Sequence, residues 1–209
     1  MRSRIVLVAL LSVLVATVAS ASEGAHSKPR GRRGRHATTN AAAADAGAPT
    51  SATTELSGFA RDMLAAHDAA RAAVSPAPRT PLPAMTWDPS LATLAQAWAD
   101  RCPNGHRPNN AHGENMYFSS EATAGAREAV TAWVSEAAHY DYASGRCVRD
   151  GEANWAYCGH HTQVVWRDTT RVGCGIRTDC RGRFPTVVVC NYEVGGNVNA
   201  TDTTIPRPY

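Results

Sequence analysis

Six cysteines lie between positions 102 and 190 of this 209-residue chain, and the way they pair limits the folds that the chain can adopt. An even number of cysteines is typical of a disulfide framework in an exported protein. The alternative is a zinc site, but the sequence contains neither a CxxC pair nor an HExxH motif. We therefore expect disulfide bonds and no free thiolate among Cys102, Cys147, Cys158, Cys174, Cys180 and Cys190.

The N-terminus has the composition of an export signal. Arg2 and Arg4 precede an apolar run that ends in the small residues ASA at 19–21. We expect residues 1–21 to be a signal peptide and the protein to be secreted into the extracellular space. The alternative, a retained membrane anchor, calls for a longer apolar run.

Residues 22–54 are polar and alanine-rich, and they lack the large apolar side chains that a core needs. We expect a disordered leader or linker here. Its basic run KPRGRRGR (28–35) has three interpretations: a processing site, a contact with acidic polysaccharide or lipid head groups, and a solvated basic tail.

The formal charge of +3 combines two parts of opposite sign. Residues 1–50 contain seven Arg or Lys against two acidic residues, whereas residues 51–209 contain 14 basic and 16 acidic residues. We therefore expect no nucleic-acid partner for the folded part, because nucleic-acid binding requires a basic surface. Lys28 is the only lysine, so the domain lacks a lysine nucleophile.

Three segments have the apolar spacing of amphipathic helices. The first is LSGFARDMLAAHDAARAAV (56–74), which a series of prolines follows. In the second, TWDPSLATLAQAWADRC (86–102), Asp88 is placed to cap the helix and Pro89 to begin it. The third, SEATAGAREAVTAWVSEA (120–137), has Glu136 near its end. Its apolar face is formed by Ala126, Val130, Trp133 and Ala137.

The end of the domain has the pattern of strands. RVGCGIRTDC (171–180) alternates Val172, Cys174 and Ile176 on one face, and FPTVVVCNY (184–192) is a β-branched run. With a turn at 179–183, these segments predict two antiparallel strands. Helices followed by strands predict an α+β domain in which helices cover a sheet.

Five segments, in order along the chain, resemble the CAP superfamily of cysteine-rich secretory, antigen 5 and pathogenesis-related proteins, and most of all its plant-type pathogenesis-related members. They are WDPSLATLAQAWA (87–99), HGENMYF (112–118), AVTAWVSEAAHYDYASGRC (129–147), CGHHTQVVWRDTTRVGCG (158–175) and VVVCNYEVGGN (187–197). The resemblance implies a CAP domain over 55–198 and a C-terminal tail over 199–209. It also implies a three-layer α-β-α sandwich with a central antiparallel sheet, stapled by disulfides.

In that family a central cleft is lined by two histidines and two glutamates. The resemblance assigns these positions to His160 of GHHTQ, Glu114 of GEN and Glu136 of WVSE, and to His106, which lies a few residues before GEN. Such a set can bind a divalent ion such as Zn²⁺ through histidines that the carboxylates orient. It can equally form a satisfied polar network that braces the sandwich.

Two further histidines stand where the family usually has aromatic residues. His161 follows His160 directly, and His112 precedes the GEN motif. We expect His161 to pack or to form hydrogen bonds rather than to belong to the cleft. Both departures replace aromatic neighbours of the cleft with imidazoles, which would make the cleft more polar or raise its metal affinity.

The resemblance also implies the disulfide pairs Cys102–Cys180, Cys147–Cys158 and Cys174–Cys190, one of the 15 pairings that six cysteines allow. Family members that bind sterols or fatty acids use an aromatic-bearing loop after the glutamate helix. The corresponding aromatic residues are Tyr140, Tyr142, Trp155 and Tyr157. The alternative is that these side chains only pack the loop over the core.

The sequence thus predicts a secreted, monomeric protein that binds a sterol or fatty acid in a defence or host-interaction role, with contact to a membrane surface or cell wall. We expect no enzyme activity, because the sequence has no GxSxG motif and no zinc-protease helix. Two alternatives stay open. One is a metal-dependent hydrolase at the four cleft residues, and the other is a signalling or polysaccharide-binding module.

Overall fold

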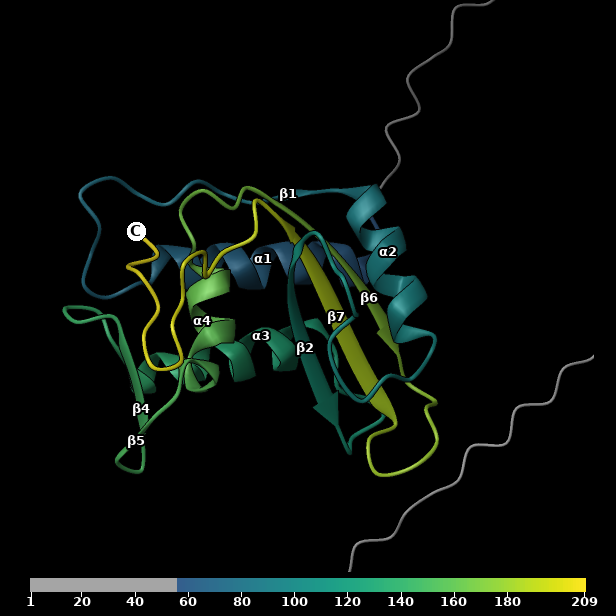
Figure 1. The fold of residues 1–209 in the computed structure, drawn as a ribbon. Coiled ribbons are helices and arrows are strands. Elements are labelled where there is room, and N and C mark those ends of the chain that lie inside the picture. Colours follow the sequence, from purple (N-terminus) through teal and green to yellow (C-terminus); the bar gives the residue numbers. More distant parts are fainter. Residues whose placement is uncertain (1–55) are drawn as a thin grey trace, which may run out of the picture. The chain divides into compact units, whose positions relative to one another are not determined.

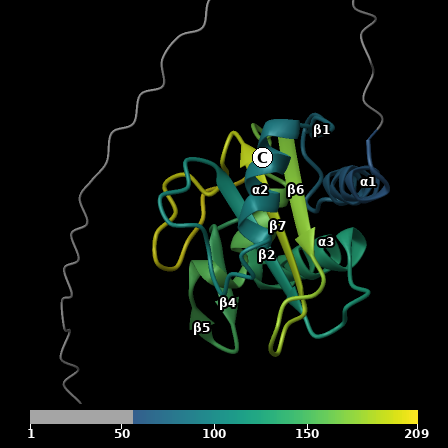
Figure 2. The same cartoon turned by 90° about the vertical axis from the view of Figure 1, so that its right-hand side faces the viewer.

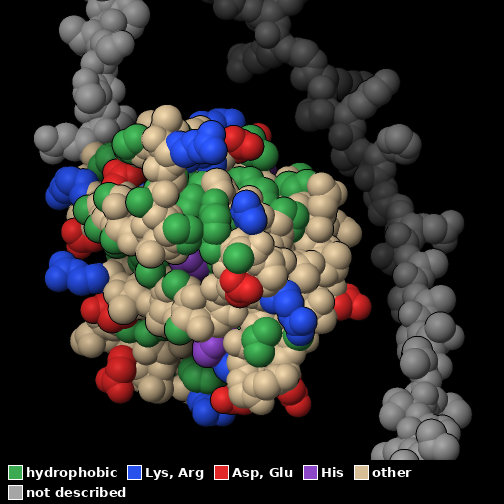
Figure 3. Space-filling model, turned by 90° about the vertical axis from the view of Figure 1, so that its left-hand side faces the viewer, with side chains coloured by type: hydrophobic (Ala, Val, Ile, Leu, Met, Phe, Trp, Pro, Cys, Tyr) green, Lys and Arg blue, Asp and Glu red, His purple; other side chains and the backbone are tan. Residues whose placement is uncertain are grey.

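The computed structural model describes residues 56–209. The expected signal peptide (1–21) and leader (22–54) therefore lie outside the described residues. Within 56–209, no helix is both long enough and apolar enough to cross a bilayer. On the face that Figure 3 shows, Arg or Lys side chains and Asp or Glu side chains are interspersed around an apolar area.

The middle layer is a four-stranded sheet with the strand order β1–β6–β7–β2 (Figure 1). Strand β7 runs antiparallel to β6, as the sequence predicts, and also to β2, which the sequence did not predict as a strand, whereas the edge strand β1 pairs with β6 in parallel. The strands are β1 (Thr86–Trp87), β2 (Gly113–Ser119), β6 (Arg171–Arg177) and β7 (Thr186–Glu193).

Helices cover both faces of this sheet (Figures 1 and 2). Helix α2 (Pro89–Ala99) packs on one face, against Val187 and Val189 of β7. Three helices pack on the other face, against Val172, Cys174, Val188 and Tyr192. They are α1 (Gly58–Ala72), α3 (Ala126–Ser135) and α4 (Gly159–Val164). The expected α-β-α sandwich is confirmed.

Two glycines of β6 explain how closely α2 approaches the sheet. A Cβ atom at Gly173 or at Gly175 would overlap the backbone of α2. The residues that alternate with them, Val172, Cys174 and Ile176, face the opposite cluster, as their alternation predicts. The GCG segment therefore sets the distance between two layers.

The helix starts follow their capping residues. Ser57 Oγ accepts a hydrogen bond from the backbone of Ala60 at 3.2 Å, and Asp88 Oδ1 accepts one from the backbone of Ser90 at 2.8 Å.

The end of α3 differs from the prediction. The α-helix stops at Ser135, and Ala137 is exposed in a 3₁₀ helix, η1 (Glu136–His139), instead of continuing the apolar face.

A smaller sheet and the C-terminal residues complete the described chain. Strands β3 (Tyr140–Asp141), β4 (Arg146–Arg149) and β5 (Glu152–Ala153) form the sheet. A 3₁₀ helix, η2 (Trp155–Tyr157), follows it. The segment predicted as a C-terminal tail packs against this region, with the Ile205 side chain fully buried beside the disulfide between Cys147 and Cys158.

All three disulfide pairs are those that the resemblance implies: Cys102–Cys180, Cys147–Cys158 and Cys174–Cys190. None of the six cysteines is free. A zinc site built on thiolates is thereby excluded, because the disulfides use every sulfur.

Candidate functional site

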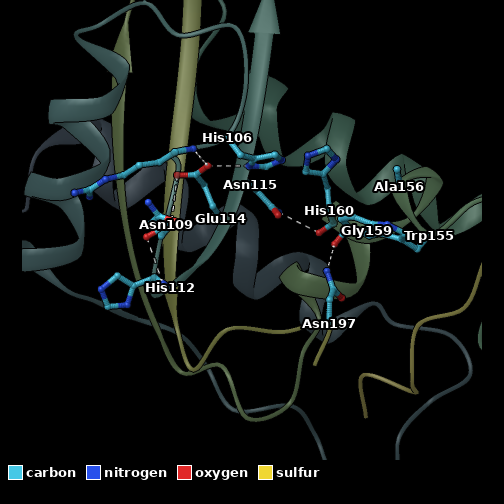
Figure 4. A pocket seen from close by; sticks show the side chains of 12 residues that line it. His106, Asn109, His112, Glu114, Asn115, Trp155, Ala156, Gly159, His160 and Asn197 are labelled. Carbon is cyan, nitrogen blue, oxygen red and sulfur yellow. Dashed lines mark hydrogen bonds and ion pairs between the residues drawn. The ribbon is translucent and has the colours of Figure 1, made fainter. Parts of the chain in front are cut away.

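A pocket of about 400 Å³ opens between the loop after α2, strand β2 and the start of α4 (Figure 4). Three of the four predicted cleft residues, His106, Glu114 and His160, line this pocket. The fourth, Glu136, contacts His160 without lining the pocket.

The first His–Glu pair joins the loop to the sheet. Strand β2 holds Glu114, whose side chain is 5% exposed, at the pocket wall. Its carboxylate accepts hydrogen bonds from His106 Nδ1 at 2.8 Å, from the backbone N–H of Arg107 at 3.0 Å and from Asn110 Nδ2 at 3.2 Å. These three donors compensate the carboxylate for its lost hydration.

The second pair joins η1 to α4. One oxygen of Glu136 accepts the backbone N–H groups of His160 at 2.9 Å and His161 at 3.2 Å, and the other accepts His160 Nδ1 at 2.7 Å. The N–H groups at a helix start have no partners within the helix and favour a negative charge. Glu136 therefore caps α4 and orients the His160 ring at the same time.

The two imidazoles lie next to each other. Their ring centroids are 6.4 Å apart, with 28° between the ring planes. The indole of Trp133 is also stacked with His160, at 6.3 Å, and its Nε1 donates to the carbonyl of Met116 at 2.9 Å. In the neutral imidazole, donation from Nδ1 to a carboxylate leaves the lone pair on Nε2 in both rings.

The four residues form two separate pairs. Within residues 56–209, no three or more His, Cys, Asp or Glu side chains are gathered closely enough to hold a metal ion. Each carboxylate already accepts three hydrogen bonds. Among the four predicted cleft residues, the atoms left to coordinate a cation at this pocket are therefore the two Nε2 atoms.

Asparagines that the sequence analysis did not assign also line the pocket. Asn115 donates to the carbonyl of His160 at 3.1 Å, and Asn197 donates to the carbonyl of Gly159 at 2.8 Å. These bonds tie the GEN and GGN motifs to GHHTQ, as Figure 4 shows. The GEN and GGN motifs were the sequence signal for these two asparagines. A motif does not reveal, however, which residue the side-chain amide of its asparagine contacts.

His161 is a buried packing residue, 8% exposed, and its Nδ1 has no hydrogen-bond partner in the described structure. Burial lowers the pKa of His161 to about 4. Its ring centroid is 6.4 Å from that of Tyr140. His112 lines the pocket, and its Nδ1 pairs with Glu193 at 3.0 Å. The imidazole of His161, which follows His160 in the sequence, thus contributes to packing.

The four aromatic residues predicted to bind ligand do not share one surface. Trp155 lines the pocket and is 41% exposed. Tyr140 donates to the carbonyl of Ile205 at 3.1 Å, Tyr142 is stacked with Tyr209, and Tyr157 lies under the guanidinium of Arg149. The three tyrosines thus hold the loop and the C-terminal segment together.

Comparisons with known proteins agree with this architecture. Residues 64–192 match the sequence profile "CAP: Cysteine-rich secretory protein family". Mouse glioma pathogenesis-related protein 1 is 33% identical over 148 residues, and this match covers 66% of the chain but 54% of the mouse protein. Pathogenesis-related protein PR-1 of Medicago truncatula is 38% identical over 144 residues, covering 66% of the chain and 75% of that protein.

Solved structures share the fold. Venom allergen-like protein 4 of Schistosoma mansoni superposes with a TM-score of 0.55 at 24% identity, covering 74% of this chain and 95% of that one. NaASP2, solved with Zn²⁺, superposes with a TM-score of 0.54 at 22% identity, covering 75% of this chain and 88% of that one. The profile match, the relatives and the shared fold show that this chain belongs to the cysteine-rich secretory protein (CAP) family.

Proposed function

We propose that this protein acts outside the cell in a defence or host-interaction role and that its pocket binds a divalent cation, zinc above all, through His106 and His160. The supporting observation is the pair of His–Glu contacts at 2.8 and 2.7 Å, which orient two neighbouring imidazoles with free Nε2 lone pairs. Carboxylates hold metal-binding histidines in this way in many proteins.

The relatives give independent support for both parts of the proposal. The Medicago protein carries the name pathogenesis-related, which is a defence description of that protein. The structure of NaASP2 contains Zn²⁺. The expected signal peptide fits an extracellular place of action.

The residues of the pocket fit a cation of modest affinity. Zinc sites use three or four protein ligands when they are catalytic or structural, whereas at this pocket the neighbouring imidazoles of His106 and His160 supply two. Asn109 and His112 also line it and leave room for solvent to complete the coordination shell. When bound there, zinc supplies a Lewis acid, so the metal-dependent hydrolase stays the alternative to a binding function.

Calorimetric titration of the full secreted chain with Zn²⁺ tests the proposal. His106→Ala and His160→Ala should each weaken binding by at least about tenfold. His112→Ala is the matched control, because His112 lines the same pocket and also pairs with a carboxylate, Glu193, but lies apart from the other two imidazoles in Figure 4. Equal losses in all three variants, or no binding by the unmodified chain, would refute a site centred on the two imidazoles. Chelator-sensitive hydrolysis of a peptide library would favour the alternative.

A second candidate function is binding of a sterol or fatty acid. The observation in its favour is Trp155, an exposed indole at the pocket edge. Equilibrium binding of labelled sterol and fatty acid should be saturable, weakened by Trp155→Ala and insensitive to His160→Ala. If His160→Ala weakens lipid binding and Trp155→Ala does not, the lipid lies away from the indole.

A further inference from the structure

Exposed arginines and aromatic rings gather where the loop after α2 meets the turn between β6 and β7. Two hollows lie side by side here, because both are lined by Pro103 and Asn104. We call their lining the arginine–aromatic surface. Its arginines are Arg101, Arg107, Arg181 and Arg183, and its aromatic residues are Trp98, Phe118 and Phe184.

The charges of this surface have one sign. No Asp or Glu lines either hollow. Within residues 56–209, none of the four guanidinium groups pairs with a carboxylate, whereas the nearby Arg177 pairs with Asp179 and Asp100. Residues 51–209 contain more acidic than basic residues, so this local excess is unusual in the domain. The face in Figure 3, by contrast, has both signs interspersed.

The aromatic rings orient two of the arginines. The guanidinium of Arg101 lies over the Trp98 ring at 5.6 Å, and that of Arg183 lies over the Phe184 ring at 5.0 Å. Phe184 is 39% exposed and packs against Phe118, with ring centroids 6.0 Å apart. Stacking holds a guanidinium by its face and leaves its N–H edge free for a planar anion.

We propose that the arginine–aromatic surface binds an anionic polysaccharide. The guanidinium edges would bind carboxylate or sulfate groups of the polymer in bidentate fashion, and the exposed face of Phe184 would contact a sugar ring. Two adjoining hollows lined by arginines suit a polysaccharide chain that carries negative charges at regular intervals. The hollow beside Trp98 shares His106 and Arg107 with the pocket, whereas Arg181 and Arg183 line only the other hollow, so the proposal does not rest on the cation.

Other polyanions fit this surface less well. An anionic bilayer or a nucleic-acid duplex presents charge over a broad area. The acidic residues of the remaining domain would repel such an area, whereas a single polysaccharide strand contacts a narrow strip. The surface also offers one well-exposed aromatic side chain, Phe184, for insertion among lipids.

Binding of the full secreted chain to polygalacturonate and to heparin tests the proposal and distinguishes carboxylate from sulfate. Neutral dextran and phosphatidylglycerol vesicles serve as comparison ligands. The double variant Arg181→Ala/Arg183→Ala should weaken binding to the preferred polymer by about tenfold and reduce its salt dependence. The control is Arg79→Ala/Arg127→Ala, which removes the same charge from two exposed arginines elsewhere and should bind as the unmodified chain does.

A further variant separates geometry from charge. Arg181→Lys/Arg183→Lys keeps the charge but loses the bidentate edge, so it should recover less than half of the lost binding energy. The proposal is overturned by an equal loss in the control, by full recovery with lysine, or by vesicles that bind more tightly than either polymer. His160→Ala should bind polymer normally, which distinguishes a failure here from a failure of the cation site.

Discussion

His160 Nδ1 lies 2.7 Å from Glu136 Oε1, and this contact connects two helices through the wall of the pocket. The other Glu136 oxygen accepts the first N–H groups of α4. One carboxylate thus determines where α4 begins and how the His160 ring is turned. Site geometry and local fold are coupled at this residue.

Replacement of Glu136 should therefore affect stability and cation binding together. Glu136→Gln keeps the size but has one acceptor oxygen for three donors, so we expect the free energy of unfolding to fall by about 2 kcal/mol. Zinc affinity should fall by about tenfold, because the imidazole loses its orienting partner. Denaturant unfolding and calorimetry measure the two effects.

Glu128→Gln is the control for this change. Glu128 also accepts a helix-start N–H, that of Gly125 at 2.9 Å, but at α3 and away from the pocket. It should cost some stability and leave zinc affinity unchanged. A loss of zinc affinity in both variants would show that stability alone explains the effect.

Local signals account for α1, α2, most of α3, β6 and β7, but not for strand β2 of the same sheet. Asp88 and Pro89 identify the start of α2, and the alternation around Cys174 identifies the inner face of β6. The end of α3 was not visible in the sequence. The periodicity continues to Ala137, but Glu136 is held at α4 by tertiary hydrogen bonds, and the helix ends there.

Replacement of His161 by phenylalanine should stabilise the protein. His161 is buried and its Nδ1 lacks a partner, so the fold bears a desolvation cost that an apolar ring removes. We expect the free energy of unfolding to rise by about 1 kcal/mol at pH 7. Urea unfolding of His161→Phe tests this, and a decrease would mean that the imidazole has a partner in solution.

The buried histidine of α1 should make the protein sensitive to acid. His67 Nε2 accepts the Tyr192 hydroxyl at 3.0 Å, and its Nδ1 donates to the carbonyl of Met63 at 2.8 Å. Burial, assisted by the nearby Arg71, lowers the pKa of His67 from 6.5 to about 4. Between these values the unfolded state binds the proton, so stability is lost as pH falls from 6.5 towards 4, by about 3 kcal/mol in total.

Unfolding free energies at pH 7 and pH 4.5 measure this contribution. His67→Gln can keep both hydrogen bonds but cannot titrate, so its loss between the two pH values should be smaller than that of the unmodified chain. Parallel losses in the two proteins would assign the acid sensitivity to other groups, such as the similarly buried His161.

The C-terminal segment should behave as part of the folded domain. Ile205 is fully buried, and its backbone N–H donates to the carbonyl of Gly145 at 2.7 Å. Ile205→Ala should lower the free energy of unfolding by about 3 kcal/mol. Val198→Ala is the control, because Val198 is 51% exposed and should change stability little. Equal effects would show that the segment contributes nothing specific.

The site was less predictable than the fold. The resemblance assigned His160, Glu136, Glu114 and His106 to one cleft, and the structure brings them together as two His–Glu pairs. The resemblance could not show that the carboxylates are saturated by backbone donors, since those donors come from segments that are distant in sequence. For the same reason the involvement of Tyr142 with Tyr209 was not visible.

The last prediction concerns the distance between α2 and the sheet. A Cβ atom at Gly175 would overlap the backbone around Gln96, and backbone cannot move aside as a flexible side chain can. Gly175→Ala should therefore lower the free energy of unfolding by about 3 kcal/mol. Gly58→Ala is the control, because no atom lies within 4 Å of its added Cβ and the residue begins α1; alanine should be neutral or slightly stabilising there. If Gly175→Ala is as stable as Gly58→Ala, α2 can move away from β6 without cost, and the GCG segment does not set the spacing of the two layers.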